Sequence, residues 1–246
     1  MGREFSTPAV VTGTRKTGES NTEITLFSPD SGVLRATVYA GRSSSKAIRP
    51  PLFSIGEFFL RKTASGHYTL TDARLVEACP FEFTLGQIAA ASFITELANL
   101  TGESDARGCF VLLSSALLAL AGDDSANNCD RVMIQFVWQL MKSAGFVSPL
   151  DCCPVCSRTY RADELLFFST NLNSFCCENC AEDRGIFIGP GARKYFLITA
   201  STDFDTALTV PLNDATARRL RTVMVRISVH LTAGRLKTVR SGMLDS

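Results

Sequence analysis

Cys153-Pro154-Val155-Cys156 and Cys177-Glu178-Asn179-Cys180 are two C-x2-C pairs separated by about twenty residues, the long end of the spacing typical of a four-cysteine zinc site. Each pair forms a tight knuckle that directs two thiolates to one point, and two knuckles surround Zn²⁺ with a tetrahedron of sulfurs. Such a site has no open position for water, so the pattern predicts a structural zinc module rather than a zinc enzyme. Its binding energy contributes to the folding of a segment too small to form its own core.

The register of the predicted ligands has alternatives. Cys152 and Cys176 directly precede the first cysteine of each pair, so they can substitute through C-x3-C spacing or approach each other and oxidise. The x2 spacing is the usual one for a knuckle, and Pro154 suits the turn after the first ligand. We therefore predict that the ligands are Cys153, Cys156, Cys177 and Cys180. A disulfide cluster is the alternative use of these residues.

The remaining cysteines and the apolar segments indicate a reducing compartment. The chain has nine cysteines, an odd number, and Cys79, Cys109 and Cys129 lie in apolar sequence where a reduced cysteine packs as a small hydrophobic residue. The first residues carry no apolar segment typical of a secretory signal. The longest apolar run, residues 110–121, is too short to span a bilayer. We expect a soluble, reduced, cytoplasmic protein that does not bind membranes.

Residues 1–78 are predicted to form short strands, because residues 23–27 and 33–40 alternate between the two faces of a strand. The residues between positions 28 and 32 are typical of a turn. The predicted strands cover residues 10–14, 23–27, 33–40, 52–62 and 68–77. Five short strands in so few residues indicate a small closed barrel, such as an OB-fold or a related Greek-key barrel.

The rest of the chain predicts helices that flank the cysteine pairs. Apolar residues recur at helical spacing over residues 85–100 after a Thr84 cap, and again over residues 110–121 and 133–144. Asn213 or Asp214 caps a later helix that stops near Gly234. A chain of 246 residues that is 46% hydrophobic is long enough for this organisation.

The predicted fold class is therefore α+β with several domains, in which an OB-fold-like barrel precedes a helical domain that contains a four-cysteine insertion. The predicted domains are the barrel (1–78), the first helical part (79–150), the zinc-binding insertion (151–183) and the second helical part (184–246).

The net charge of +1 predicts no partner by itself, but the cations are not evenly distributed. The barrel segment contains a Gly/Ser-rich loop with three cations, and such cations neutralise nucleic-acid phosphates and release counterions. Tyr39, Phe53, Phe58 and Phe59 are candidate stacking faces for bases. The alternative is that the cations are solvated and the phenylalanines are core residues. The candidate DNA-binding residues are Arg15, Lys16, Arg35, Arg42, Lys46, Arg49, Arg61 and Lys62.

The C-terminal segment is also basic. Arg218, Arg219 and Arg226 leave the apolar face of the predicted helix free, so they can form a basic strip for an anionic partner. The alternative is that these arginines favour the C-terminal end of the helix or pair with acidic residues elsewhere.

No catalytic motif is present in the sequence. The two histidines, His67 and His230, belong to no zinc-protease or deaminase pattern, and no P-loop, G-x-S-x-G or G-x-G-x-x-G occurs. A cysteine nucleophile needs an activating base, and no histidine lies near a suitable cysteine in sequence. We therefore predict a protein that is not an enzyme.

Several short motifs follow one another in a fixed order. They are Gly18-Glu19-Ser20, Ile24-Thr25-Leu26-Phe27, Ala40-Gly41-Arg42, Glu96-Leu97, residues 136–150 followed by Cys153 and Cys156, and Leu236-Lys237-Thr238. In this order and spacing, the chain resembles the RecO family of bacterial DNA repair and recombination mediator proteins over most of its length. Ser157 departs from the family, which usually has glycine after the first knuckle.

The resemblance implies binding of single- and double-stranded DNA, of the acidic C-terminal tail of single-stranded DNA-binding protein, and of RecR. It implies assistance to RecA loading and strand annealing, in a bacterial cytoplasm and at the nucleoid. An acidic, hydrophobic tail needs an apolar groove flanked by a cation. The helix carrying Arg131 and the basic helix carrying Arg218, Arg219 and Arg226 are the candidate positions for that groove.

Two other classes of protein remain as alternatives. A zinc-ribbon scaffold that binds only proteins would show no salt-dependent binding to oligonucleotides. A thiol-based redox enzyme using Cys152 and Cys176 would need an exposed thiolate with a depressed pKa.

Overall fold

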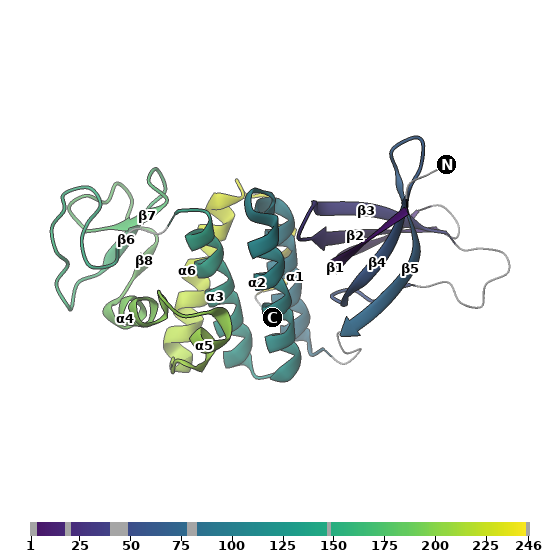
Figure 1. The fold of residues 1–246 in the computed structure, drawn as a ribbon. Helices are drawn as coiled ribbons and strands as arrows, with labels where there is room; N and C mark the ends of the chain where they lie inside the picture. The colour runs from purple at the N-terminus through teal and green to yellow at the C-terminus, as the bar shows by residue number, and fades with distance from the viewer. Residues whose placement is uncertain (1–3, 18–20, 40–48, 78–82, 147–148, 245–246) are drawn as a thin grey trace.

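The structure is a computed structural model that describes residues 4–17, 21–39, 49–77, 83–146 and 149–244. Three parts follow one another along the molecule (Figure 1). A β-barrel and a small cysteine-containing sheet lie on opposite sides of a helical body. The prediction of an α+β fold with an OB-like barrel followed by helices is confirmed.

The barrel contains the first five strands of the chain. They are β1 (Glu4–Thr17), β2 (Asn21–Ser28), β3 (Gly32–Val38), β4 (Ile55–Lys62) and β5 (Tyr68–Glu77). The closed order is β1-β2-β3-β5-β4, and only the short β3–β5 pairing is parallel. β1 is longer than the predicted strand because its first half pairs with β4 and its second half with β2. A register shift between Val11 and Gly13 marks the bend that permits both pairings.

The two ends of the barrel have different surroundings. At one end Val10, Phe27 and Phe53 join the core of the helical body. The opposite end lies away from the helices (Figure 1) and is formed by residues 15–17, 21–23, 37–39, 49 and 61–69, which we call the distal rim. Between the two ends, alternate side chains fill a separate interior core that includes Ile24, Leu26, Phe58 and Leu60.

The helical body is centred on α3 (Ala126–Ser143), which packs against α1 (Leu85–Thr101), α2 (Ala106–Gly122) and α6 (Asp214–Leu231). The predicted Thr84 cap is confirmed, since its side chain accepts a hydrogen bond from the N–H of Gln87 in a capping box. Of the two alternatives for α6, Asn213 is the cap. The shorter helices are η1 (Gly102–Asp105), α4 (Pro190–Thr199), α5 (Phe204–Thr209) and α7 (Lys237–Arg240).

Glu96 in the middle of α1 joins that helix to the C-terminal end of the chain. One carboxylate oxygen accepts the N–H of Lys237 at 2.7 Å, and the other accepts the N–H and the hydroxyl of Thr238 at 2.9 and 2.8 Å. The Glu96-Leu97 and Leu236-Lys237-Thr238 motifs of the sequence are therefore in direct contact. The carboxylate satisfies backbone donors at the start of α7, where no side chain of α7 provides a cap.

One helical stretch among the described residues, Leu85–Gly122, is long and apolar enough to cross a membrane by length and composition. It is not one continuous helix, because η1 separates α1 from α2. The two helices lie side by side (Figure 1). At the end of the pair opposite to η1, the Gln87 side-chain amide at the start of α1 donates a hydrogen bond to the Leu120 carbonyl at the end of α2. The stretch is thus a helical hairpin that packs on α3.

Candidate metal centre and nucleic-acid interface

The sulfurs of Cys153, Cys156, Cys177 and Cys180 all lie within 4.8 Å of one another. Those of Cys156 and Cys177 are 3.8 Å apart. Four sulfurs at about 2.3 Å from a tetrahedral Zn²⁺ are separated by about 3.8 Å, so the donor set and its spacing fit this metal. The structure thus brings together the four cysteines that we predicted, from two knuckles far apart in sequence.

Backbone hydrogen bonds shape each knuckle. The Ser157 N–H donates to the Cys153 carbonyl at 2.8 Å, and the Cys153 N–H donates to the Arg158 carbonyl at 2.9 Å. Ser157 has a φ of 57°, the left-handed conformation that glycine adopts most readily. In the second knuckle the N–H groups of Cys180 and Ala181 both donate to the Cys177 carbonyl at 3.0 Å.

The knuckles favour thiolates at their buried positions. Burial raises the pKa of the Cys153 thiol, but hydrogen bonds from the backbone of Cys177, Cys156 and Val155 outweigh it and lower the pKa to about 6. Burial also opposes ionisation of Cys177, but hydrogen bonds from Cys180 and Arg158 outweigh it, so its pKa is lowered. The hydrogen bond to Cys177 raises the pKa of Cys180 to about 12. Metal ligation requires deprotonated thiols, so two of the four positions are already prepared for it.

Cys152 and Cys176 lie outside the group of four. The Cys176 thiol is buried and donates to the Phe167 carbonyl at 3.5 Å, and burial raises its pKa to about 11. Cys152 forms a backbone bridge with Thr159, and burial also raises the pKa of its thiol. A raised pKa disfavours the thiolate that a redox enzyme would use.

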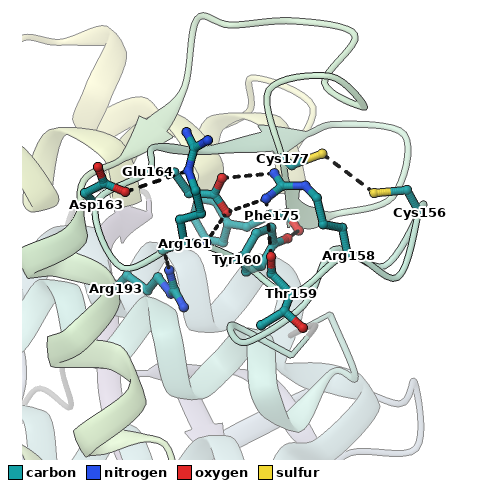
Figure 2. A network of polar contacts seen from close by, with 10 residues as sticks. All are labelled: Cys156, Arg158, Thr159, Tyr160, Arg161, Asp163, Glu164, Phe175, Cys177 and Arg193. Carbon is teal, nitrogen blue, oxygen red and sulfur yellow. Dashed lines mark hydrogen bonds and ion pairs between the residues drawn. The ribbon is translucent and has the colours of Figure 1, made fainter.

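A three-stranded sheet carries the second knuckle. The sheet has the order β7-β6-β8, from β6 (Leu166–Ser169), β7 (Ser174–Cys176) and β8 (Phe187–Ile188). Together with residues 150–165 and 177–186 it forms what we call the cysteine module. The Tyr160 hydroxyl donates to the Phe175 carbonyl at 3.1 Å and so links the two knuckle segments (Figure 2).

Side chains of the helical body hold the cysteine module in place. Arg193 of α4 donates to the carbonyls of Leu150 and Arg161 at 2.8 and 2.6 Å, and its guanidinium lies over the Tyr160 ring (Figure 2). On α6, Arg226 donates to the Gly185 carbonyl at 2.6 Å. Backbone carbonyls of the module are therefore fixed by charged donors of two helices.

Five of the predicted DNA-binding cations lie at the distal rim. Arg15 and Arg61 are exposed and each forms an ion pair, Arg15 with the half-buried Glu23 at 3.3 Å and Arg61 with the exposed Glu4 at 2.6 Å. The rim also contains the exposed residues Lys16, Arg49 and Lys62. Arg35 lies on the outer face of β3, away from the very end of the strand. Arg42 and Lys46 lie outside the described residues.

The predicted stacking residues divide into two groups. Phe53 and Phe58 are buried, so the interpretation of these two rings as stacking faces is wrong. Tyr39 is 58% exposed just after β3, and the half-buried Phe59 has the Arg74 guanidinium 5.0 Å from its ring centre. Arg74 was not among the predicted residues. It is exposed on β5 and pairs with Glu57, two residues before Phe59 on the neighbouring strand.

The four predicted partner-binding arginines do not form one strip. Arg131 is half-buried and donates to the Val210 carbonyl at 3.2 Å, and Arg226 is held by Gly185 as described above. Arg218 and Arg219 are exposed on α6, and Arg219 lines a groove of about 330 Å³ between α6 and the start of α4. The other lining residues are mostly apolar: Leu165, Phe187, Ile188, Gly189, Pro190, Gly191, Ala192, Thr216, Leu220 and Val223.

This groove has a positive character at two points. Gly189 precedes α4 without a side chain that caps the helix, so backbone N–H groups at the start of α4 are available to an anion. The second point is the Arg219 guanidinium. An apolar wall with a cation and a helix N-terminus can accept a hydrophobic peptide that carries carboxylates.

Comparisons with known proteins cover both halves of the chain. A family described as "Recombination protein O N terminal" matches residues 1–79, and "Recombination protein O C terminal" matches residues 82–239. The border between the two matches falls at the start of the helical body.

Curated relatives give the same result. Over 244 residues the chain is 22% identical to the DNA repair protein RecO of Syntrophus aciditrophicus, covering 95% of this chain and 93% of that protein. It is 29% identical to the DNA repair protein RecO of Pelotomaculum thermopropionicum, over 72% of this chain and 68% of the relative. The chain is 26% identical to the DNA repair protein RecO of a Thermoanaerobacter strain, over 72% of this chain and 71% of the relative.

Proposed function

This chain belongs to the RecO family, and from that premise we propose that it is a non-enzymatic mediator of DNA repair and homologous recombination. In this proposal the barrel binds single- and double-stranded DNA, and the helical body binds the C-terminal tail of single-stranded DNA-binding protein. The protein also binds RecR and assists RecA loading and strand annealing. It acts in the bacterial cytoplasm at the nucleoid.

The cysteine module holds Zn²⁺ in this proposal, through Cys153, Cys156, Cys177 and Cys180. The observation that supports the assignment is the grouping of four sulfurs within 4.8 Å, two of them on buried residues. Zinc with four thiolates supplies cross-linking and no catalysis. Purified protein is expected to contain one equivalent of zinc per chain by metal analysis, and its absence would contradict this part of the proposal.

The distal rim is the DNA-binding surface. The single observation that carries this assignment is that three exposed cations from separate segments lie at the same end of the barrel. Lys16 pairs with Thr22, Arg49 lines a pocket with Thr22 and Val38, and Lys62 pairs with Tyr68. That end of the barrel lies away from the helices (Figure 1). Tyr39 adds an exposed ring at the same end. Phosphate contacts from such cations give affinity that falls with salt, and an exposed ring offers a base a stacking face.

A charge-reversal experiment tests the rim. The variant Lys16→Glu/Lys62→Glu should bind a fluorescent single-stranded oligonucleotide more weakly than the natural protein. The slope of log K against log salt should become shallower by about 0.7 for each phosphate that the variant no longer neutralises. The matched control is Lys194→Glu/Arg218→Glu, two exposed cations of the helical body with the same change in net charge. Equal reductions of affinity in both variants would show a non-specific charge effect and reject the rim.

The groove between α4 and α6 is the binding site for the acidic, hydrophobic tail of single-stranded DNA-binding protein. Its apolar wall fits hydrophobic side chains, and Arg219 and the start of α4 fit carboxylates. Arg219→Glu should weaken binding of a tail peptide at least about tenfold, because it replaces attraction by repulsion at the edge of the groove. Arg218→Glu, on the same helix but outside the groove, should have little effect. If the two variants bind the peptide equally well, this groove is not the tail site.

The two experiments also separate the proposed function from its main rival. A protein-binding scaffold would bind the tail peptide and would show no salt-dependent binding to DNA even at low salt. That result would exclude DNA as a partner while leaving the groove intact.

A further inference from the structure

A cleft of about 570 Å³ lies where the helical body meets the cysteine module, and we call it the junction cleft. It is lined by η1, by Cys109 near the start of α2, by the ends of α1, α3 and α6, and by Asn173 between β6 and β7. Its volume falls within the range of about 300–1,000 Å³ that is typical of ligand sites. His230 and Leu231 line it at the C-terminal end of α6, whereas the groove proposed for the acidic tail lies along residues 216–223 of that helix. The junction cleft is therefore a separate site.

The floor of the junction cleft is apolar. Leu140 and Met141 of α3 are buried beneath it, together with Cys109. At its edge Phe146, just after α3, is 39% exposed, and Leu231 is half-buried. An exposed aromatic ring beside a buried apolar floor can contact a hydrophobic side chain of a ligand, and the face of the ring also attracts a cation.

The junction cleft has a negative character. Three helices end in its lining, at Thr101 of α1, Ser143 of α3 and Leu231 of α6, and each C-terminus carries about half a negative charge. The described residues that line the cleft include the carboxylate of Asp105 but no lysine or arginine. Asp105 is exposed, and its Oδ1 accepts the Gly108 N–H at 3.0 Å as the cap of α2. That carboxylate offsets the positive N-terminus of α2 at the same place.

The basic side chains next to this lining in sequence are engaged elsewhere. Lys142 of α3 donates to the Ala200 carbonyl after α4. Arg107 of α2 pairs with Asp30 of the barrel at 2.7 Å. The His230 ring, which lines the cleft, donates through Nε2 to a backbone carbonyl of the turn between β6 and β7 at 3.1 Å. These contacts leave the negative character of the cleft to be matched by a ligand.

We propose that the junction cleft binds a basic, hydrophobic peptide segment of a partner protein. A lysine or arginine of the segment meets Asp105 and the ends of the three helices, and a neighbouring apolar side chain packs on Phe146 and the floor. The charge of this segment is opposite to that of DNA and of the acidic tail. The cleft therefore adds a further interaction surface to the chain and is not a second place for either of those ligands.

The first test compares two fluorescent pentapeptides in binding to the full-length protein, followed by fluorescence anisotropy. The peptide LRLRL alternates leucine with arginine, and SRSRS keeps the charge without the apolar side chains. LRLRL should bind at least about tenfold more tightly, because its leucines gain burial on the apolar floor. Equal affinities of the two peptides, or equally tight binding of argininamide alone, would overturn the inference, because the cleft would then recognise a cation and not a hydrophobic segment.

The second test removes the carboxylate without removing the helix cap. Asp105→Asn keeps an oxygen that can cap α2, and it should weaken binding of LRLRL about two- to fivefold. The matched control is Asp203→Asn, because Asp203 is also exposed and caps α5 by accepting the Thr206 N–H at 2.8 Å, but lies outside the cleft. The control should stay within about 1.5-fold of the natural protein.

A third test places a cation in the cleft. Ser143→Lys introduces repulsion at the end of α3 and should weaken binding of LRLRL at least about tenfold. Ser201→Lys makes the same change at an exposed position outside the cleft and should have little effect. If the cleft variants and their controls bind LRLRL equally well, the peptide binds elsewhere and the junction cleft is not its site.

Discussion

The barrel and the cysteine module both consist of short strands, but different interactions hold them together. In the barrel five strands close on themselves around side chains such as Leu26 and Phe58, which no solvent reaches. The module has three strands of two to four residues, and most of their buried apolar side chains belong to the core of the helical body. A closed sheet can provide its own core, whereas this short open sheet packs on a neighbouring domain and, in our proposal, is also held by zinc.

Removal of the proposed zinc is the change with the largest expected effect on this contrast. Structural zinc sites in small domains contribute apparent binding free energies of about 10–16 kcal/mol. We expect a strong chelator, or Cys153→Ser/Cys177→Ser, to abolish amide hydrogen-exchange protection in β6, β7 and the two knuckles. Protection in β2 and β4 of the barrel should persist. Loss of protection in both regions would show that the module and the barrel fold as one unit.

Acid should reproduce part of this effect. Protons compete with the metal for the thiolates, and the pKa of Cys153 is lowered to about 6. A lowered pKa stabilises the fold above the ordinary thiol range, and this stabilisation is lost as the pH falls through about 6. Zinc release followed by chelator absorbance should therefore rise steeply as the pH is lowered from 7 to 5. Release that begins already near pH 8 would contradict the preparation of Cys153 as a thiolate.

Phe58→Ala tests the barrel without touching the metal. The Phe58 side chain is fully buried in the barrel interior, and loss of a buried phenylalanine costs about 3–5 kcal/mol. The midpoint of chemical denaturation of the barrel strands should fall, while the zinc content stays at one equivalent. Phe59→Ala is the control on the outer face of the same strand and should cost less, since Phe59 is half-buried.

Glu96→Ala tests a connection that lies in neither region. The substitution removes three hydrogen bonds that a carboxylate accepts from Lys237 and Thr238. Hydrogen bonds to charged groups contribute about 1.5–3 kcal/mol, so we expect a reduction of this order in the unfolding free energy. Glu96→Gln keeps one acceptor oxygen and should lose less. Protease digestion should cut the last residues of the alanine variant faster, and equal rates would show that other contacts hold α7.

The smallest expected effect concerns the surface between the barrel and the helices. Arg107 and Asp30 form an ion pair at 2.7 Å, but their side chains are 77% and 63% exposed. Exposed pairs contribute about 0.2–1 kcal/mol. Asp30→Asn should therefore change the unfolding free energy by less than about 1 kcal/mol, as measured by chemical denaturation. A larger change would mean that this pair, and not the apolar contacts of Phe27 and Phe53, fixes the barrel on the helical body.

Local sequence patterns predicted the strands and helix caps, because these elements depend on residues that are close together in sequence. The alternation in residues 23–27 and the Thr84 cap depend on neighbours in sequence, and both agree with the structure. The four cysteines carry their own spacing rule, so their grouping could be predicted as well.

Features that depend on tertiary packing could not be predicted from the sequence. Whether Phe58 faces inward, or whether Arg131 is held by Val210, depends on partners distant in sequence. The groove beside Arg219 is built from three segments, so no single stretch of sequence contains its signal. The predicted domain borders at 78, 150 and 183 stay predictions.

The contact of Glu96 with Lys237 and Thr238 has a consequence for synthesis on the ribosome. The partners are 141 and 142 residues apart, and translation proceeds at about 5–20 residues per second, so about 7–28 s pass between them. The barrel emerges first and its strands are complete long before that time. The helical body, in contrast, reaches its final form only when nearly the whole chain has left the exit tunnel. A nascent chain stalled before residue 237 would therefore have a folded barrel, while Glu96 of α1 would still lack its hydrogen bonds to Lys237 and Thr238.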